Sequence, residues 1–199
     1  MPSAVVASGD QMADFFFDLG LQDRMVGYTK GSCWSTASED PARDQVPQLM
    51  NPGEGLTNLS KEELLATGCD FLMAWDSTFS DKNFNKDFCD ENGIAMYFPY
   101  VCTDSATFAD LYKDYETLGE IFKVQDLAAE KVQAMKDTLQ EVQDALGDEA
   151  YENPVKVFAY DSGEDVPFTA CQGMPGDIIK KAGGISIFDD IEAGWAKPS

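Results

Sequence analysis

Short runs of apolar residues alternate, along the first hundred residues, with stretches in which apolar positions recur every three or four residues. The runs predict β-strands and the periodic stretches predict helices, an alternation typical of an α/β fold with a parallel sheet. The predicted strands are 4–8, 25–29, 71–75 and 94–100, with a short one near 48–50. We therefore expect residues 1–104 to form one doubly wound, mainly parallel α/β lobe.

Local signals mark the ends of several elements in this lobe. Gly20 follows a helical stretch at 11–19 and supplies the left-handed residue that often ends a helix. Ser60 and Glu63 have the spacing of a capping box that begins another helix, and a third is expected at 82–91. The polar stretch 30–58 is too long for a simple connection, so we expect a binding loop there.

The pattern changes after residue 104, where helical periodicity dominates. Apolar side chains recur at helical spacing from Phe108 to Phe122, and again in a second helix at 126–146. About 20 residues of helix reach about 30 Å, long enough to bridge two lobes. We expect a helical region at 105–149. Residues 150–199 then begin a second α/β lobe, with a strand at 155–160 and a helix at 176–182.

Composition excludes several classes of function. The chain has 14 basic and 36 acidic residues, a net charge of −22, and no histidine. Such an acidic chain is a poor partner for nucleic acid or an anionic membrane. Without histidine, Ser–His triads, Cys–His dyads and HExxH zinc sites are excluded. No glycine-rich phosphate motif follows a predicted strand, so neither an enzyme nor a cofactor is expected.

The cysteines and the N-terminus add little chemistry. No two cysteines have CxxC spacing, which disfavours metal ribbons and redox motifs, and we expect small buried residues instead. The first residues lack the pattern of a signal peptide, and no apolar run approaches the roughly 20 residues of a membrane span. The chain is therefore either cytosolic or separated from an export signal, and composition does not choose between these. The five cysteines are Cys33, Cys69, Cys89, Cys102 and Cys171.

Ligands of open α/β sheets bind at the carboxyl ends of the strands. Trp75 ends a strand there, as either a core residue or a ligand contact, whereas Trp34 in a polar loop is hard to explain as packing. Lys30 and Arg43 are the basic residues of the long loop. The candidate ligand contacts from this argument are Asp10, Lys30, Trp34, Trp75, Asp76 and Tyr100.

Several landmarks along the chain resemble one known family. The chain is similar to the ABC-transporter substrate-binding proteins that carry iron–siderophore complexes, haem or cobalamin. The resemblance covers essentially the whole chain, and its landmarks are weak singly and strong together. They are FDLGLQDRMVG (17–27), NLSKEELLATGCDFL (58–72), GIAMY (93–97), LGEIF (118–122), PFT (167–169), AGGISIFDD (182–190) and GW (194–195).

The resemblance implies two α/β lobes joined by a long helix, with the ligand in the cleft between them. It implies aromatic ligand contacts at Trp75 and Trp195, adds Phe168 in the PFT landmark, and places Glu62 on the surface that docks to the permease. Few basic groups surround the half-cleft in view, so a neutral or cationic complex fits better than an anionic one. The protein is expected to be monomeric and extracytoplasmic, in the periplasm or as a lipoprotein.

The chain departs from the family pattern at its end. Members continue after the Gly-Trp landmark, so the second lobe is expected to be incomplete, and the export signal and lipobox cysteine are missing. Two alternatives stay open: a truncated or isolated lobe that binds nothing by itself, and an α/β enzyme that uses a nucleotide.

Overall fold

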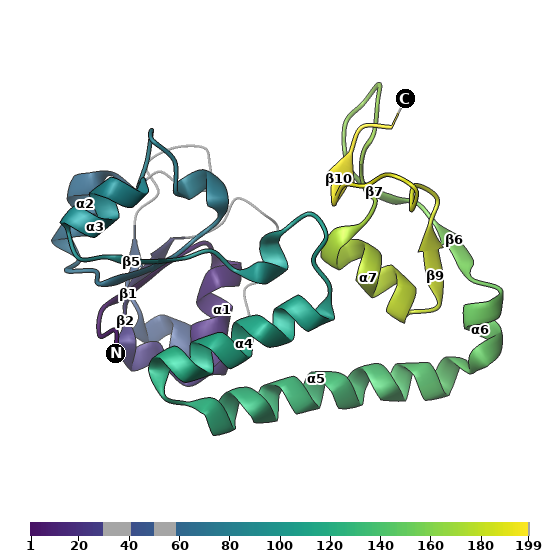
Figure 1. Ribbon diagram of the computed structural model, residues 1–199, viewed down its shortest axis with the longest axis horizontal. Helices are drawn as coiled ribbons and strands as arrows, with labels where there is room; N and C mark the ends of the chain where they lie inside the picture. Colours follow the sequence, from purple (N-terminus) through teal and green to yellow (C-terminus); the bar gives the residue numbers. More distant parts are fainter. Residues whose placement is uncertain (30–40, 50–58, 199) are drawn as a thin grey trace. The chain divides into compact units, whose positions relative to one another are not determined.

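The computed structural model describes residues 1–29, 41–49 and 59–198 (Figure 1). The chain forms two compact units. The N-terminal unit comprises Met1–Pro99 and Leu118–Leu127, and the C-terminal unit comprises Tyr100–Thr117 and Ala128–Ser199. The three-part division expected from the sequence, at residues 104 and 149, stays a prediction.

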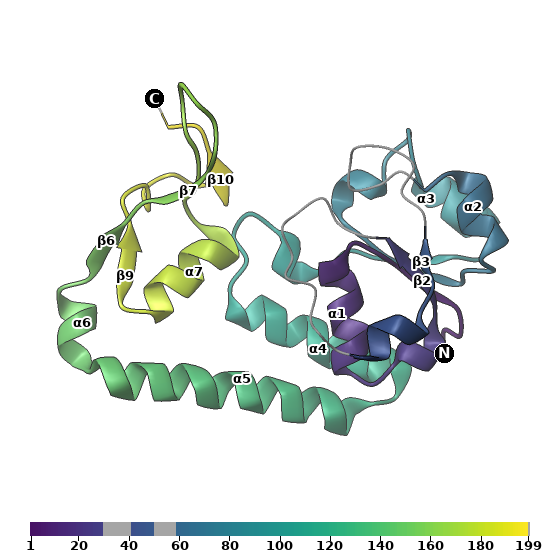
Figure 2. The same ribbon diagram turned by 180° about the vertical axis from the view of Figure 1, so that it is seen from behind.

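A five-stranded parallel sheet forms the centre of the N-terminal unit (Figures 1 and 2). Its strand order is β3-β2-β1-β4-β5, so the connections run in opposite directions from the central strand β1. This confirms the doubly wound α/β lobe and puts a topological switch point between β1 and β4. The strands are β1 (Val5–Ser8), β2 (Met25–Thr29), β3 (Gln48–Leu49), β4 (Phe71–Met73) and β5 (Ala95–Tyr97).

Each face of this sheet has its own core, because neighbouring residues of a strand point to opposite faces. On one face, Phe71 packs edge-to-face against Phe16 and Phe122, with ring centroids 6.3 and 5.3 Å away. Its neighbour Leu72 belongs to the core of the other face, which helices α2 (Lys61–Ala66) and α3 (Lys86–Glu91) cover. Members of that second core include Val6, Leu64, Cys69, Leu72, Phe84, Cys89 and Ile94.

Most of the local helix signals are confirmed. Helix α1 (Asp10–Asp18) ends with Gly20 at φ +64°, and the Leu21 N–H donates 2.7 Å to the Phe16 carbonyl, as in a Schellman motif. Ser60 and Glu63 make the expected capping box. Helix α3 begins at Lys86, four residues later than predicted, because the Asn85 side chain caps it by accepting from Phe88 N–H.

Two long helices follow the sheet. They are α4 (Phe108–Phe122) and α5 (Gln125–Leu146), and α5 extends for 22 residues. The helix predicted at 126–146 is confirmed, and it begins one residue earlier, at Gln125. Within the described ranges, no helix combines the length and apolarity needed to cross a bilayer.

The C-terminal unit holds more strands than predicted. The strand expected at 155–160 is two strands, β6 (Val155–Val157) and β7 (Ala159–Ser162), and a short helix α6 (Asp148–Glu152) precedes them. Strand β7 pairs antiparallel with β8 (Phe168–Ala170), which pairs antiparallel with β10 (Trp195–Ala196). Helix α7 (Gly173–Lys181) begins earlier than predicted, and β9 (Gly184–Ser186) pairs parallel with β6. The expectation of barely one strand and one helix was wrong, because strands of two to four residues are too short to show an alternating pattern.

Four short 3₁₀ turns complete the described elements: η1 (Gln22–Arg24), η2 (Pro41–Gln45), η3 (Asp76–Thr78) and η4 (Tyr100–Cys102). Cys69, Cys89 and Cys171 are buried free thiols, and Cys102 is half-buried. Burial raises the pKa of the Cys69 thiol to about 11. Cys33 lies outside the described residues.

Candidate functional site

The carboxyl ends of the central strands meet at one edge of the N-terminal sheet. Ser8, at the end of β1, is in register with Thr29 at the end of β2, and Ala7 is in register with Met73 of β4. The segments that carry Asp10, Trp75 and Asp76 therefore leave the sheet at the same edge, as predicted for a parallel sheet.

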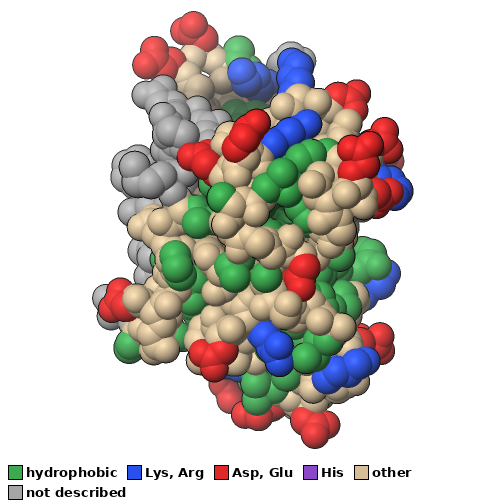
Figure 3. Space-filling model, turned by 90° about the vertical axis from the view of Figure 1, so that its left-hand side faces the viewer, with side chains coloured by type: hydrophobic (Ala, Val, Ile, Leu, Met, Phe, Trp, Pro, Cys, Tyr) green, Lys and Arg blue, Asp and Glu red, His purple; other side chains and the backbone are tan. Residues whose placement is uncertain are grey.

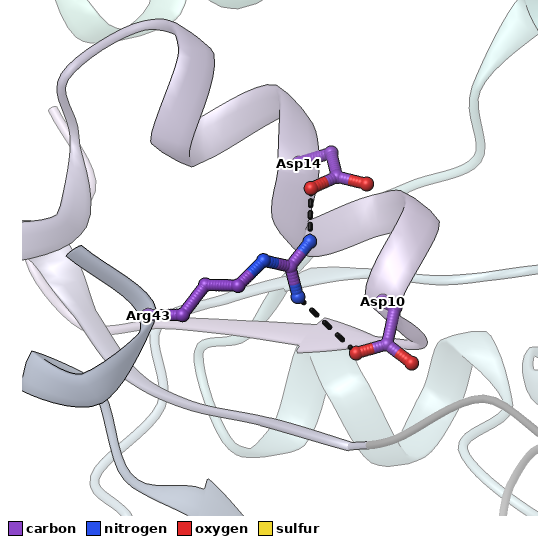
Figure 4. Close-up of polar contacts among 3 residues, drawn as sticks. All are labelled: Asp10, Asp14 and Arg43. Atoms are coloured by element: carbon purple, nitrogen blue, oxygen red, sulfur yellow. Dashed lines mark hydrogen bonds and ion pairs between the residues drawn. The ribbon is translucent and has the colours of Figure 1, made fainter. Parts of the chain in front are cut away.

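Asp10 is the first residue of α1 and is buried. Its Oδ1 atom lies 3.3 Å from Nη1 of Arg43, and Nη2 of the same guanidinium pairs with Asp14, one turn further along α1 (Figure 4). Arg43 comes from η2, so this cluster fixes the middle of the polar stretch 30–58 to the start of α1. The negative charge of Asp10 is also favoured by its place at a helix N-terminus.

Arg43 is buried and contacts both carboxylates and aromatic rings. Its side chain is 7% exposed, and its guanidinium lies over the rings of Phe17 and Tyr28, at 5.1 and 5.9 Å from their centroids. Burial raises the pKa of Asp14, and the positive charge of Arg43 opposes that rise. With two carboxylates and two rings as partners, Arg43 is a structural cation rather than a group free to bind an anion.

Trp75 lies two residues beyond the end of β4 and is half-buried. Its indole N–H is buried and has no hydrogen-bond partner in the part of the chain that the structure describes. The same holds for the buried hydroxyl groups of Thr29, at the end of β2, and Thr78, in η3. Unsatisfied buried polar groups are costly, and these three lie at or just beyond the ends of β2 and β4. Asp76 is exposed and accepts a 2.6 Å hydrogen bond from Ser77 N–H.

Phe168 and Trp195 stack on one another in the C-terminal unit. Their ring centroids are 5.8 Å apart and their planes differ by 25°. Strand pairing places them, because Trp195 lies opposite Ala170 and Ala196 lies opposite Thr169. Trp195 is 41% exposed, so the pair presents a flat aromatic surface to solvent.

Tyr100 also belongs to the C-terminal unit, in η4. Its ring is 38% exposed, and Nζ of Lys113 lies 3.7 Å from its centroid. Its backbone N–H donates 2.9 Å to Asp114, which fixes the turn. Tyr100 is thus an accessible aromatic residue with a cation over its face.

The predicted contacts fall into two sets, one in each unit. The structure brings Asp10, Trp75 and Asp76 to one sheet edge, and it stacks Phe168 on Trp195. Lys30 and Trp34 lie outside the described residues. Sequence reasoning missed Thr78, whose only signal was its position just after a predicted strand. It placed Thr29 at the carboxyl end of a strand without giving the side chain a role.

Glu62 is exposed on α2. It borders a hollow of about 380 Å³ that Lys61 and Lys82 also line. The neighbouring Glu63 is occupied with capping, and hydrogen bonds from the backbone and hydroxyl of Ser60 lower its pKa. Glu62 is therefore the carboxylate of this first turn that is left to face solvent.

The described surface is rich in single charges but has no cluster suited to a metal ion. On the face shown in Figure 3, acidic side chains lie singly or in small groups among neutral and apolar ones. Within the described ranges, no group of three or more Cys, Asp or Glu side chains could hold a metal ion. The arrangement offers aromatic surfaces and hydrogen-bonding groups for binding.

We compared the chain with known protein families and solved structures. No protein-family profile matches the chain. A periplasmic binding protein from Veillonella parvula DSM 2008 matches all of the chain and 65% of its own length, at 27% identity and a TM-score of 0.86. An ABC-type Fe3+-hydroxamate transport system structure from Saccharomonospora viridis matches all of the chain and 69% of its own length, at 19% identity and a TM-score of 0.77. The chain has the fold of a periplasmic binding protein.

Other solved structures with this fold are described as vitamin B12- and haem-binding periplasmic proteins of Vibrio cholerae. By sequence, 143 residues (72% of the chain) are 23% identical to the uncharacterized ABC transporter substrate-binding lipoprotein YvrC of Bacillus subtilis. The match spans 41% of that lipoprotein. The resemblance to periplasmic binding proteins of iron, haem and cobalamin transporters that the landmarks predict is thus confirmed.

The two sets of candidate contacts stay predictions. Ligands of open α/β units bind outside the carboxyl ends of the strands, where Asp10 and Trp75 lie. The Phe168–Trp195 stack is an exposed aromatic surface within the C-terminal unit.

Proposed function

We propose that this protein is the solute-binding component of an ABC importer. It captures an iron complex (a siderophore complex or haem) or cobalamin outside the cytoplasm and delivers it to a membrane permease, and it catalyses no reaction. The observation that carries the proposal is the match to a periplasmic binding protein over the whole chain, with a TM-score of 0.86. The chain spans 65% of that protein, and its match spans 41% of the Bacillus lipoprotein. Because the relatives are longer, we propose the transport role and do not infer it from the match alone.

The aromatic residues suit a large, rigid ligand. Phe168 and Trp195 present area that is already ordered by stacking, so few rotamers are frozen when a ligand binds. Trp75 contributes an indole ring and an N–H without a partner on the described part of the chain. Corrinoids and ferric hydroxamates combine apolar area with amide groups that such a surface recognises.

The charges favour a neutral or cationic ligand over an anionic one. Arg43 is neutralised by Asp10 and Asp14, leaving one net negative charge in that cluster. Two other basic side chains of the N-terminal unit are engaged elsewhere: Lys86 pairs with Asp90, and Lys61 lies over the Phe88 ring. We therefore expect cobalamin or a hydroxamate complex to bind more tightly than haem or a catecholate complex.

Tryptophan fluorescence tests this proposal. The protein is titrated with cyanocobalamin, ferrioxamine B, haem and ferric enterobactin up to about 50 µM, with free tryptophan as the control for light absorption by the ligands. We expect saturable quenching by at least one of the first two. Trp195→Leu should weaken binding about tenfold, whereas Tyr151→Leu, which removes an exposed aromatic residue elsewhere in the same unit, should not.

One outcome would remove the aromatic surface from the proposal, and another would overturn the proposal as a whole. Equal affinity of wild type and Trp195→Leu for every ligand would show that the Phe168–Trp195 stack does not contact the ligand. Turnover of a nucleotide by the purified protein, with no binding of the four complexes, would favour the α/β enzyme instead.

A further inference from the structure

A second hollow lies within the C-terminal unit, away from the Phe168–Trp195 stack. It has a volume of about 570 Å³, within the range of roughly 300–1,000 Å³ that is usual for small-molecule sites. Four helices contribute to it: α4, α5, α6 and α7. Its lining residues are Tyr112, Lys136, Leu139, Gln140, Gln143, Tyr151, Asp177, Lys180 and Lys181.

The lining is basic in a chain whose net charge is −22. It contains three lysines and one aspartate, and Lys180 and Lys181 occupy the last turn of α7. Lys180 pairs with Asp189 at 2.7 Å, whereas Lys136 and Lys181 have no carboxylate partner among the described residues. Two lysines without an acidic partner are unusual where acidic residues outnumber basic ones more than two to one.

Asp177 is the one acidic residue of the lining, and its carboxylate binds the N-terminus of α4. Its carboxylate accepts a 2.8 Å hydrogen bond from the N–H of Phe108, the first residue of α4. A helix N-terminus is a favourable partner for a carboxylate. Asp177 therefore acts as a cap for α4 and does not pair with Lys136 or Lys181.

The hollow also has an aromatic and apolar side. Nζ of Lys136 lies 5.0 Å from the ring centroid of Tyr112. Burial raises the pKa of Tyr112, with a further contribution from Asp177, so its phenol stays protonated at neutral pH. Lys136, Leu139, Gln140 and Gln143 follow one another at helical spacing on a single face of α5.

We propose that this hollow binds a small organic anion: an aromatic or planar molecule that carries a phosphate or carboxylate group. Its anionic group lies against Lys136 and Lys181, its ring packs on Tyr112 and Leu139, and the glutamine amides accept and donate at its edge. The inference does not rest on the proposed transport function, because none of these residues belongs to either set of candidate transport contacts.

Calorimetric titration with pyridoxine 5′-phosphate tests the proposal, since this probe combines an aromatic ring with a phosphate. We expect a dissociation constant of about 10–100 µM at low salt. Lys136→Gln and Lys181→Gln should each weaken binding about tenfold, because each removes a charge-assisted contact. The matched control is Lys156→Gln, an exposed lysine on β6 outside the hollow, which should leave binding unchanged.

Inorganic phosphate tests the role of the ring. It should bind at least tenfold more weakly than the probe, and Tyr112→Leu should remove that difference. The proposal is wrong if the probe gives no binding heat, if the Lys136 and Lys181 variants bind as wild type does, or if Lys156→Gln weakens binding as much as they do. Thermal melts of each variant show whether a loss of binding is a loss of folding.

Discussion

At the residue scale, the most informative side chain is Arg43. In the sequence it is a basic residue in a polar loop, where a role in binding an anion is an obvious hypothesis. In the structure it is buried between Asp10 and Asp14 and packed against two aromatic rings. Its two carboxylate partners lie about thirty residues away, so no local pattern could predict the cluster. The pairing leaves Arg43 itself little free positive charge.

Replacing Arg43 by methionine should lower the free energy of unfolding by about 3 kcal/mol, because the buried carboxylate of Asp10 loses its counter-ion. Urea denaturation of wild type and Arg43→Met measures this directly. Adding Asp10→Asn to the variant should restore part of the loss. A change below about 1 kcal/mol would show that the cluster is not a structural element.

Asp70 should make the free energy of unfolding depend on pH, because folding lowers the pKa of its carboxyl group. Burial would raise the pKa of this carboxyl, but hydrogen bonds from the backbone of Ala4 and from the backbone and hydroxyl of Ser3 outweigh burial and lower it. A lowered pKa means that the stabilisation is present above the unfolded value of about 3.9 and is lost as the pH falls through the folded value.

Asp70→Asn should therefore cost about 1 kcal/mol at pH 7, after allowance for solvent screening, and less as the pH falls from roughly 5 to 2. Chemical denaturation at several pH values gives the curve. Asp165→Asn, at an exposed position in the turn between β7 and β8, is the control and should show no such trend. A pH-independent difference would contradict the assignment.

At the element scale, the sequence predicted the strands of the N-terminal sheet and the long helices well. These elements have strong periodicity or unambiguous ends, such as Gly20 and the capping box at Ser60. The prediction failed for α6 and for the short strands of the C-terminal unit. There, pairing between distant segments, such as Trp195 with Ala170, decides the structure, and two or three residues leave no periodic signal.

Helix α2 is the element on which the docking proposal can be tested. Glu62 faces solvent beside the capping residue Glu63, so its carboxylate is free to meet an arginine of a permease. Glu62→Gln should weaken association with the permease up to about fivefold, because an exposed ion pair contributes at most about 1 kcal/mol. Ligand affinity should stay unchanged.

Surface plasmon resonance on permease in nanodiscs measures this association. Glu91→Gln, at the exposed end of α3 in the same unit, is the matched control and should behave as wild type. If Glu62→Gln weakens ligand binding as much as docking, α2 is not a docking element.

At the scale of the whole molecule, the fold and its relationship to periplasmic binding proteins could be predicted from ordered landmarks along the chain. The candidate site could be predicted only in part. Asp10 and Trp75 follow strands, which the pattern reveals, whereas the stacking of Phe168 on Trp195 depends on strand pairing across an intervening helix. The buried hydroxyl groups of Thr29 and Thr78 have no sequence signal beyond their positions at or after predicted strands, because threonine is common in strands for packing reasons alone.

The central claim is that the protein captures a metal complex, and the amount of bound metal tests it most directly. The protein is equilibrated by dialysis against a mixture of cyanocobalamin, ferrioxamine B, haem and ferric enterobactin, and bound cobalt and iron are measured by mass spectrometry. We expect about one metal atom per protein, from the neutral or cationic complexes. A protein compartment with no more cobalt or iron than the surrounding buffer would contradict the claim.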